Sequence, residues 1–276
     1  MVSGVQESKR GYFARILGLG GKRHGERQSE AQPDGHAAIR GLLAHQKVQI
    51  VYQPIVSLSS GRVYAYEALA RPHAEYFPNP LALFSAAVDA DMTGELGRLL
   101  RQQAVAQCPD YPLFLNVHPA ELGEPFLVRP DDPLFQHPEP IYLEVTESVP
   151  LSHFALCHEV LDEVRGKGIR MAVDDLGAGF SNLKYISDLA PEVVKLDRQL
   201  VAGVDHKQRQ QRLLRSVVRL CQEMGATVVA EGIETKGELQ AVRDAGAELG
   251  QGFLLARPAL PPPDVAWPLA DATASA

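Results

Sequence analysis

Two carboxylates stand side by side near the middle of the chain, where an apolar run gives way to a glycine-rich loop. They are Asp174 and Asp175, in the stretch MAVDDLGAGFSNL that spans residues 171–183. Adjacent like charges repel each other, and each is costly to bury unless a positive group holds it. Two neighbouring acids at the end of a buried segment therefore predict a positive partner.

Other polar side chains also close apolar runs along the chain. Besides the aspartate pair, these are Glu67, Asn116, Glu144, Lys195, Glu231 and Gln251. One acid after a strand is usually a helix cap or a solvated loop residue. Seven independent repeats of that arrangement are improbable, and capping favours Ser, Thr, Asn and Asp, whereas this set holds three glutamates and a lysine. The pattern indicates a functional site.

The residue types at these positions favour hard metal ions. Five carboxylates facing one small volume cannot all stay ionised without countercharge. Carboxylate and amide oxygens, with no His or Cys among them, suit Mg²⁺ or Mn²⁺ better than zinc. Two such ions beside a lysine are typical of phosphoryl transfer and phosphodiester hydrolysis. In that chemistry Lys195 would hold the attacking water or a phosphate oxygen, and Arg71 would make a bidentate phosphate contact.

Two other interpretations of these residues explain less. The GAG stretch before a predicted helix could bind phosphate through backbone N–H groups, but without metal the neighbouring aspartates would repel phosphate. A barrel glycosidase needs two carboxylates, and would leave three further acids and Lys195 unexplained.

The elements that must position these residues are eight short apolar or β-branched runs that alternate with segments of helical periodicity. The runs span residues 48–56, 62–70, 113–117, 141–146, 169–175, 192–197, 226–231 and 247–252. This alternation predicts an α/β fold, a TIM-like (β/α)8 barrel whose strands converge on one mouth at their carboxyl ends. Only SLSSG separates the first two runs, which predicts a hairpin and hence one antiparallel strand near the start.

The clearest predicted helix spans residues 207–224. Its apolar side chains at helical spacing predict one buried face, made of Leu213, Val217, Leu220 and Met224. The three cysteines, Cys108, Cys157 and Cys221, are widely spaced and form no CxxC pair. Each falls on the apolar stripe of a predicted helix, which indicates core residues in a reducing compartment and a cytoplasmic location.

Composition narrows the function classes. With 276 residues, 45% of them hydrophobic, the chain can bury a full-sized core as one main domain. A net charge of −7 argues against duplex nucleic acid as a partner. The sequence has no apolar run of the roughly 18 residues that span a bilayer, which argues against an integral membrane protein.

The predicted organisation has three parts. Residues 1–37 form a flexible leader and linker, for which weak membrane or partner docking is the alternative role. Residues 38–262 form the folded domain, and residues 263–276 a flexible C-terminal tail.

Seven motifs follow one another between residues 40 and 260. They are YEALAR (66–71), LNV (115–117), LEVTES (143–148), VDDLGAGFSNL (173–183), VKLD (194–197), VVAEGIET (228–235) and GQGF (250–253). In order and spacing they closely resemble the EAL-domain family of bacterial cyclic-di-GMP phosphodiesterases. The resemblance implies a TIM-like barrel, a homodimer, and hydrolysis of cyclic di-GMP to linear pGpG with two Mg²⁺ or Mn²⁺ ions in second-messenger signalling.

The resemblance also implies roles for single residues. It makes Lys195 the residue that orients the nucleophilic water, Glu231 the general base or a water-polarising partner, and Glu67 a further catalytic residue. Glu147 would brace the loop 175–183 and couple it to the dimer interface. The implied metal ligands, or residues directly around the metals, are Glu67, Asn116, Glu144, Asp174, Asp175 and Glu231. The implied nucleotide contacts are Gln53, Leu69, Arg71, Asp197 and Gln251.

Four positions depart from the family pattern. Leu176 replaces the usual aromatic residue, and Ala178 and Phe180 stand where Thr and Tyr are commoner, so possible hydrogen bonds of the loop are lost. His118 replaces a usual Ser and is interpreted as a surface or core group rather than a ligand. A catalytically silent cyclic-di-GMP receptor, or a protein-interaction module, is the alternative function. Silent members lack a carboxylate or the lysine, whereas here the set is complete.

Overall fold

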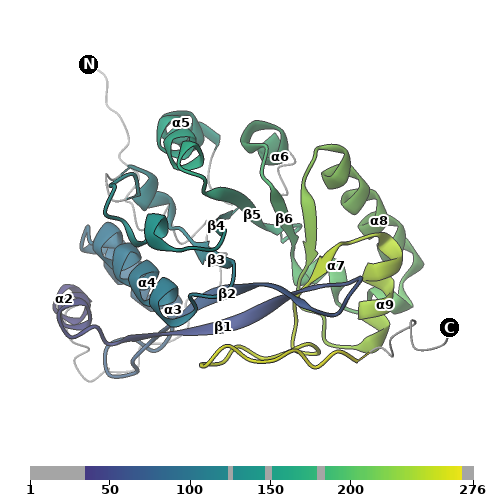
Figure 1. Cartoon of the computed structure of the whole chain (residues 1–276), viewed down its shortest axis with the longest axis horizontal. Helices are drawn as coiled ribbons and strands as arrows, with labels where there is room; N and C mark the ends of the chain where they lie inside the picture. The colour runs from purple at the N-terminus through teal and green to yellow at the C-terminus, as the bar shows by residue number, and fades with distance from the viewer. Residues whose placement is uncertain (1–34, 124–126, 147–150, 179–183, 269–276) are drawn as a thin grey trace, which may run out of the picture.

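Eight strands close into a barrel in sequence order, with helices packed around it (Figure 1). The computed structural model describes residues 35–123, 127–146, 151–178 and 184–268. The strands are β1 (Val48–Ser57), β2 (Val63–Pro72), β3 (Leu113–Asn116), β4 (Ile141–Thr146), β5 (Arg170–Leu176), β6 (Val193–Leu196), β7 (Thr227–Ala230) and β8 (Leu249–Gly250). The predicted α/β barrel is confirmed, and every predicted run overlaps one of these strands.

The first strand runs against its neighbours. β1 pairs antiparallel with β2 and also with β8, whereas the pairs from β2 to β8 are all parallel. The tight connection between β1 and β2 therefore forms the predicted hairpin. Because β2 to β8 are parallel, their carboxyl ends open at one mouth of the barrel.

Helices surround the barrel and join its strands. The α-helices are α2 (Gly35–His45), α3 (Pro80–Asp89), α4 (Thr93–Gln107), α5 (Leu151–Gly166), α6 (Lys184–Leu189), α7 (Arg198–Val201), α8 (Gln208–Glu223) and α9 (Lys236–Ala245). Short 3₁₀ turns are η1 (Pro119–Gly123), η2 (Pro133–Gln136) and η3 (Val204–His206). In Figure 1, α2, α3 and α4 lie at one end of the molecule and α8 and α9 at the other.

Apolar side chains fill the barrel below the mouth. The cluster of buried residues there is Ile55, Ala65, Phe114, Tyr142, Ala172, Val193, Val229 and Leu249. The rings of Phe114 and Tyr142 stack with their centroids 4.3 Å apart. The hydroxyl of Tyr142 also contacts Tyr64 and accepts a hydrogen bond from Arg170 (2.6 Å). This packed interior makes the barrel a core rather than a channel.

Helix α8 buries a different face from the one that the sequence predicts. The buried side chains are Leu214, Val218 and Cys221, whereas Leu213 and Met224 of the predicted face are 51% and 46% exposed. The buried face matches the stripe around Cys221. Cys108 is also buried but follows α4 instead of lying within it, and the side chain of Cys157 lies outside the description.

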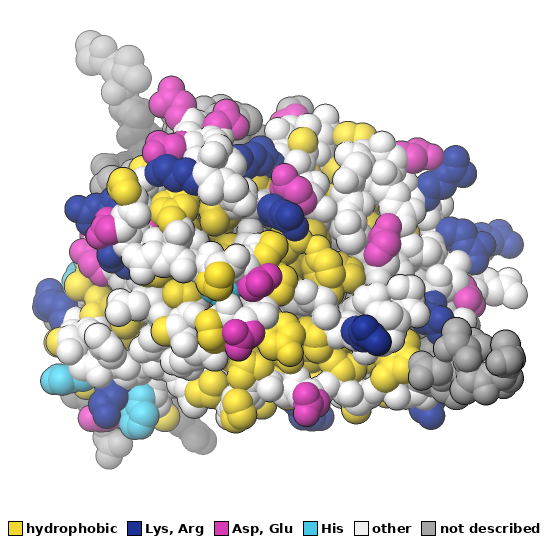
Figure 2. Space-filling model, viewed as in Figure 1, with side chains coloured by type: hydrophobic (Ala, Val, Ile, Leu, Met, Phe, Trp, Pro, Cys, Tyr) yellow, Lys and Arg dark blue, Asp and Glu magenta, His cyan; other side chains and the backbone are white. Residues whose placement is uncertain are grey.

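The chain after β8 returns along the outside of the first hairpin, where Figure 1 shows it beneath β1. Tyr52 and Ala259 exchange backbone hydrogen bonds of 2.8 and 3.0 Å, and the Tyr66 hydroxyl donates to the carbonyl of Pro263 (3.0 Å). Trp267 packs close to Gly61. Figure 2 shows hydrophobic side chains gathered over this lower part of the same face.

Within the described residues, no helix combines the length and apolar character needed to cross a bilayer.

Candidate metal centre and active site

A local irregularity in β5 turns two consecutive acids toward the mouth. In a regular strand, neighbouring side chains point to opposite faces. Here the pairing of β5 with β6 shifts between Val173 and Leu176, and Asp175 adopts a left-handed backbone with φ of 60°. A non-glycine residue in that conformation is uncommon and often marks a functional turn. The backbone N–H of Asp175 donates to Asp174 Oδ1 (2.9 Å), and this fixes the pair.

Lys195 lies at the centre of four carboxylates inside the mouth. Its Nζ lies 2.5 Å from Glu144 Oε1, 2.8 Å from Glu231 Oε1, 3.2 Å from Asp174 Oδ1 and 3.5 Å from Glu67 Oε2. The Lys195 side chain is 1% exposed, so water screens these charges poorly. Four acids around one ammonium leave a negative excess that the described side chains around Lys195 do not balance.

Glu67 is held in place by amides as well as by Lys195. Gln251 Nε2 donates to Glu67 Oε2 (2.8 Å), and Asn116 Nδ2 donates to Glu67 Oε1 (3.3 Å). Gln251 Nε2 also lies 3.3 Å from Gln53 Oε1, and Gln53 Nε2 donates to the carbonyl of Ala256 (3.1 Å). A network of amides therefore links β1, β3 and the end of β8 to this one carboxylate.

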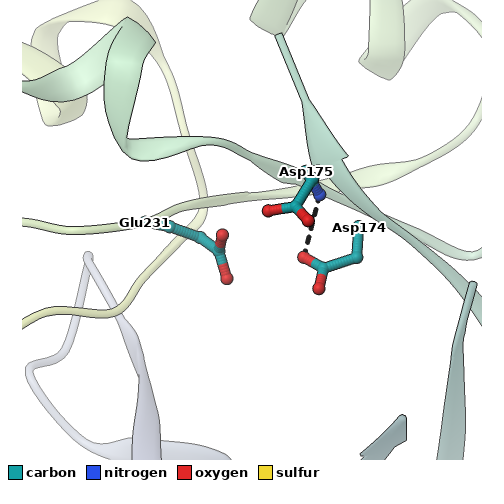
Figure 3. Close-up of side chains that lie close together, drawn as sticks. All are labelled: Asp174, Asp175 and Glu231. Atoms are coloured by element: carbon teal, nitrogen blue, oxygen red, sulfur yellow. Dashed lines mark hydrogen bonds between the residues drawn. The ribbon is translucent and has the colours of Figure 1, made fainter. Parts of the chain in front are cut away.

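Asp174, Asp175 and Glu231 also bring three carboxylate oxygens close to one another at the mouth. Figure 3 shows Asp174 and Asp175 from β5 facing Glu231, which follows β7. One carboxylate oxygen from each residue lies within 4.8 Å of the other two. Asp174 and Glu231 belong to both groups, because Asp174 Oδ1 and Glu231 Oε1 also contact Lys195. The structure thus brings all six predicted metal-site residues to one mouth, with Asp174 and Glu231 joining the two groups.

Burial and mutual repulsion shift the pKa values of these groups. Burial, and then the charges of neighbouring acids, hold the pKa of Glu144 and of Glu231 well above the usual value despite the attraction of Lys195. Burial raises the pKa of Asp174 in the same way. Burial would also raise the pKa of Glu67, but Lys195 and the two amide donors outweigh it and lower that pKa. Burial opposes the charge on Lys195, yet the four acids raise its pKa well above normal.

These residues fit divalent cations. Glu144 Oε2 is buried and has no hydrogen-bond partner among the described residues, which is costly for a carboxylate unless another group meets it. Carboxylate oxygens with an amide oxygen nearby are the donors that Mg²⁺ and Mn²⁺ prefer. Metal binding would supply the positive charge that the site lacks and would displace its protons.

The fold and these residues agree with a match to known proteins. The family model of the EAL domain matches residues 36–258. The chain belongs to the EAL domain family. The cyclic di-GMP phosphodiesterase RocR of Pseudomonas aeruginosa is 30% identical over 80% of this chain and 59% of RocR. The blue light- and temperature-regulated antirepressor BluF of Escherichia coli is 29% identical over 79% of this chain and 56% of BluF.

A solved EAL relative shares the fold over most of the chain. The structure of Klebsiella pneumoniae BlrP1 with manganese and cyclic di-GMP is 31% identical, with a TM-score of 0.66 over 78% of this chain and 56% of BlrP1. This chain spans between 28% and 59% of the length of eight curated relatives.

The predicted nucleotide contacts of the EAL domain do not all lie together. Leu69 and Arg71 line a cleft of about 230 Å³ that also borders Asn116 at the mouth. Gln53 and Gln251 are buried under Glu67 in the amide network. Asp197 instead caps α7, because its Oδ1 accepts from the N–H of Gln199 (2.8 Å). Its nucleotide contact stays a prediction, as do the roles of the other four residues.

Some predictions fall outside what the structure describes. Glu147 and Phe180 lie outside the described residues. Leu176 is buried and Ala178 exposed. His118 is half-buried, stacks against Phe84 with the rings 6.0 Å apart, and has its pKa lowered to about 4 by burial. A neutral, stacked histidine agrees with its interpretation as a packed group.

Sequence reasoning missed one buried ion cluster. Arg101 of α4 pairs with Glu121 and Asp132 beneath the turn that follows β3. No sequence signal joins these residues, because they lie 20 and 31 positions from the arginine. An arginine in the middle of a helix is usually a solvated residue, and only the tertiary structure shows this one to be buried.

Proposed function

We propose that this EAL domain hydrolyses cyclic di-GMP to linear pGpG with two Mg²⁺ or Mn²⁺ ions. The observation that carries the proposal is the excess of acid around Lys195, where four carboxylates surround one buried ammonium. Similarity to RocR and BlrP1 supports the choice of substrate. A phosphodiester is an anion, so it could not approach this mouth until the acids were neutralised.

The proposed metal ligands form two groups at the mouth, one for each ion. Asp174, Asp175 and Glu231 would hold one ion, since their oxygens already lie within 4.8 Å of one another. A second ion would take Glu67, Asn116 and Glu144, with Asp174 shared between the two. When bound, the two ions would supply charge neutralisation, polarisation of the phosphodiester and a nucleophile at neutral pH.

Lys195 would orient the attacking water, and Glu231 would accept its proton. Because the four acids raise the pKa of Lys195, its ammonium stays charged and can hold a water or a phosphate oxygen as a donor. Glu231 has a side chain that is 17% exposed, more than that of Glu144 or Glu67. It is therefore the acid that an incoming water meets first, and we assign it the role of general base.

The test is to incubate the purified chain with cyclic di-GMP in Mg²⁺, in Mn²⁺ and in EDTA, and to follow pGpG by chromatography. Nucleotide binding is measured in parallel by calorimetry. We expect pGpG in both metals and none in EDTA. Binding without any product in either metal would reject catalysis and favour a receptor.

The receptor is the second candidate, and one comparison favours it. BluF, which is 29% identical over 79% of this chain and 56% of BluF, is named an antirepressor, a role that is not catalytic in name. The complete set of acids with Lys195 favours catalysis, because a receptor has no need of a nucleophile-orienting lysine. The same assay separates the two candidates.

We also propose that the chain forms a homodimer in the cytoplasm. The exposed apolar stripe of α8, with Leu213 and Met224 at its ends, supports a second copy as the covering partner. Sedimentation velocity of the wild type is expected to show a dimer. Leu213→Lys combined with Met224→Lys is expected to give a monomer, and Arg219→Glu/Glu223→Arg, which swaps an exposed ion pair on the same helix, serves as the control. A wild type that sediments as a monomer would reject the dimer.

A further inference from the structure

A second buried ion cluster lies beside the metal site, on the outside of β3. Arg101 of α4 is 2% exposed and lies between Glu121 and Asp132, which are 1% and 0% exposed. Arg101 Nη1 donates to Glu121 Oε2 (2.6 Å). Nε and Nη2 donate to the two oxygens of Asp132 (3.2 and 3.1 Å). The guanidinium therefore joins α4 to the two 3₁₀ turns η1 and η2.

The cluster is built without spare room. A Cβ added at Gly97, one turn before Arg101 on α4, would lie 1.8 Å from Glu121 Oε2. Glycine is therefore required there to admit the carboxylate against the helix. Burial opposes the charge of Arg101, but Glu121 and Asp132 raise its pKa, so the guanidinium stays charged.

Arg101 has two ion pairs in this cluster, which we call its Glu121 arm and its Asp132 arm. Only the Glu121 arm is connected to the metal site. Glu121 Oε1 accepts from the backbone N–H of His118 (3.1 Å), two residues after Asn116. Asn116 in turn donates to Glu67 Oε1 (3.3 Å), and the N–H between them, that of Val117, donates to the carbonyl of Glu144 (3.1 Å). The end of β3 is thus held by Glu121 on one side and, on the other, by the carboxylate of Glu67 and the backbone carbonyl of Glu144.

The Asp132 arm leads away from the site. Its Oδ1 accepts from the N–H of Leu134 (3.1 Å) and so caps η2. The two arms share the same guanidinium and the same burial, but they hold different segments. This makes them a matched pair for separating a role in the metal site from a role in stability.

We propose that Arg101, acting through Glu121, is a positioning residue for the metal site. It fixes the turn after β3 and thereby sets where Asn116 presents its amide between the acids. The inference rests on the proposed metal-dependent function. Stability alone is a weak reason for such a cluster, because well-packed apolar residues often stabilise a core as much as a buried ion pair does. Mutation of a residue that hydrogen-bonds a metal ligand commonly lowers the metal affinity about 10- to 100-fold.

The experiment compares Glu121→Gln with Asp132→Asn in the full chain. Each amide keeps the shape of its carboxylate but can serve fewer of the donors that meet it, so each variant breaks one arm of Arg101. We measure the dissociation constant of Mn²⁺ by calorimetric titration, the melting temperature in EDTA, and kcat at saturating Mn²⁺. Arg219→Ala, which removes the exposed ion pair with Glu223 on α8, controls for surface charge.

We expect both amide variants to lower the melting temperature by similar amounts. The dissociation constant of Mn²⁺ should rise about 10-fold or more in Glu121→Gln and less than about twofold in Asp132→Asn and Arg219→Ala. Equal Mn²⁺ affinities in the two amide variants, or losses that follow the melting temperature alone, would overturn the inference. A wild type that binds Mn²⁺ but releases no pGpG would reject hydrolysis alone, since the Mn²⁺ comparison still decides the inference. A wild type that binds no Mn²⁺ would overturn both.

Discussion

Two buried cations of this molecule differ in how closely the charges around them balance. Lys195 and Arg101 are 1% and 2% exposed, and each is surrounded by carboxylates. Lys195 has four acids within 4 Å, whereas Arg101 has Glu121 and Asp132, whose oxygens also accept backbone N–H groups. The first cluster is left short of positive charge, and the second is close to satisfied.

The difference lies in what remains for a ligand. Around Lys195 the pKa values of Glu144, Asp174 and Glu231 are raised, so these acids release their protons at higher pH than usual, and a metal ion would compete with those protons. Around Arg101 every nitrogen of the guanidinium donates to a carboxylate. The unbalanced cluster at the barrel mouth therefore supports the proposed cation binding, and the balanced cluster behind β3 supports the proposed positioning role.

The largest effect is expected for Asp174→Asn. Asp174 contacts Lys195 and also belongs to the group with Asp175 and Glu231, so its loss should prevent binding of both metal ions and reduce pGpG formation below detection. A ligand at 100 times its dissociation constant stabilises a protein by about 2.7 kcal/mol, and Asp174→Asn should lose the matching rise in melting temperature with Mn²⁺. Asp131→Asn, on the surface beside Arg98, is the control. Turnover like that of the wild type would contradict the metal assignment.

Lys195→Met is expected to have the next largest effect. Removing the donor that orients the water should lower kcat about 100- to 1,000-fold, as for other single electrostatic contacts of this kind, while Mn²⁺ still binds the acids. Lys167→Met removes a lysine that pairs with Glu163 on the surface and should leave kcat within a factor of two, roughly the scatter of a neutral surface change. Steady-state assays at saturating Mn²⁺ measure both, and an unchanged kcat in Lys195→Met would reject its role.

How far the sequence predicts this site depends on which structural level is considered. The alternating runs and the polar residues near their ends identify the barrel, its hairpin and the residues of the mouth, because these features follow from periodicity and strand polarity. The sequence predicts the positions of these residues within the strands less well. It places Glu67 and Glu144 at strand ends, whereas they lie inside β2 and β4. A barrel strand continues past the layer in which its side chains meet.

The remaining features depend on tertiary contacts. Asp175 takes a left-handed backbone that glycine normally favours, so no local signal announces the bulge. Helix α8 carries two adjacent apolar stripes, and only its packing on the barrel selects Leu214 over Leu213 as the buried side chain. The pairing of Arg101 with Asp132 spans 31 positions and has no period.

The pH dependence of metal binding should separate the two clusters further. A glutamate whose pKa is raised in the folded chain keeps its proton at pH values above 4.5, the ordinary pKa of the side chain. In the metal-free chain it therefore loses stabilising free energy as pH rises from that value toward the folded pKa. Glu67, whose pKa is lowered, acts in the opposite direction, but it is one acid against the three with raised values.

Binding of Mn²⁺ should consequently release protons, and its affinity should rise roughly tenfold per pH unit for each proton released. Calorimetry at pH 6 in two buffers of different ionisation enthalpy measures the number released. Asp132→Asn should release as many protons as the wild type, because its acid belongs to the other cluster. A Mn²⁺ affinity that stays constant between pH 5 and pH 8 would contradict the raised pKa values.

The smallest effect is expected for Gly97→Ala, which presses on the Arg101 cluster without changing a charge. The added Cβ meets Glu121 Oε2 at 1.8 Å, so Glu121 must move, at a cost of about 1–3 kcal/mol in the free energy of unfolding. Gly166→Ala is the matched control, because a Cβ there meets nothing within 4 Å at the end of α5 and should be neutral or stabilising. Urea unfolding measures both.

Since Glu121 also accepts a hydrogen bond from the N–H of His118, Gly97→Ala should weaken Mn²⁺ binding a few-fold while Gly166→Ala leaves it unchanged. Equal Mn²⁺ affinities in these two variants, together with a lower stability in Gly97→Ala, would mean that the Arg101 cluster supports the fold but not the metal site.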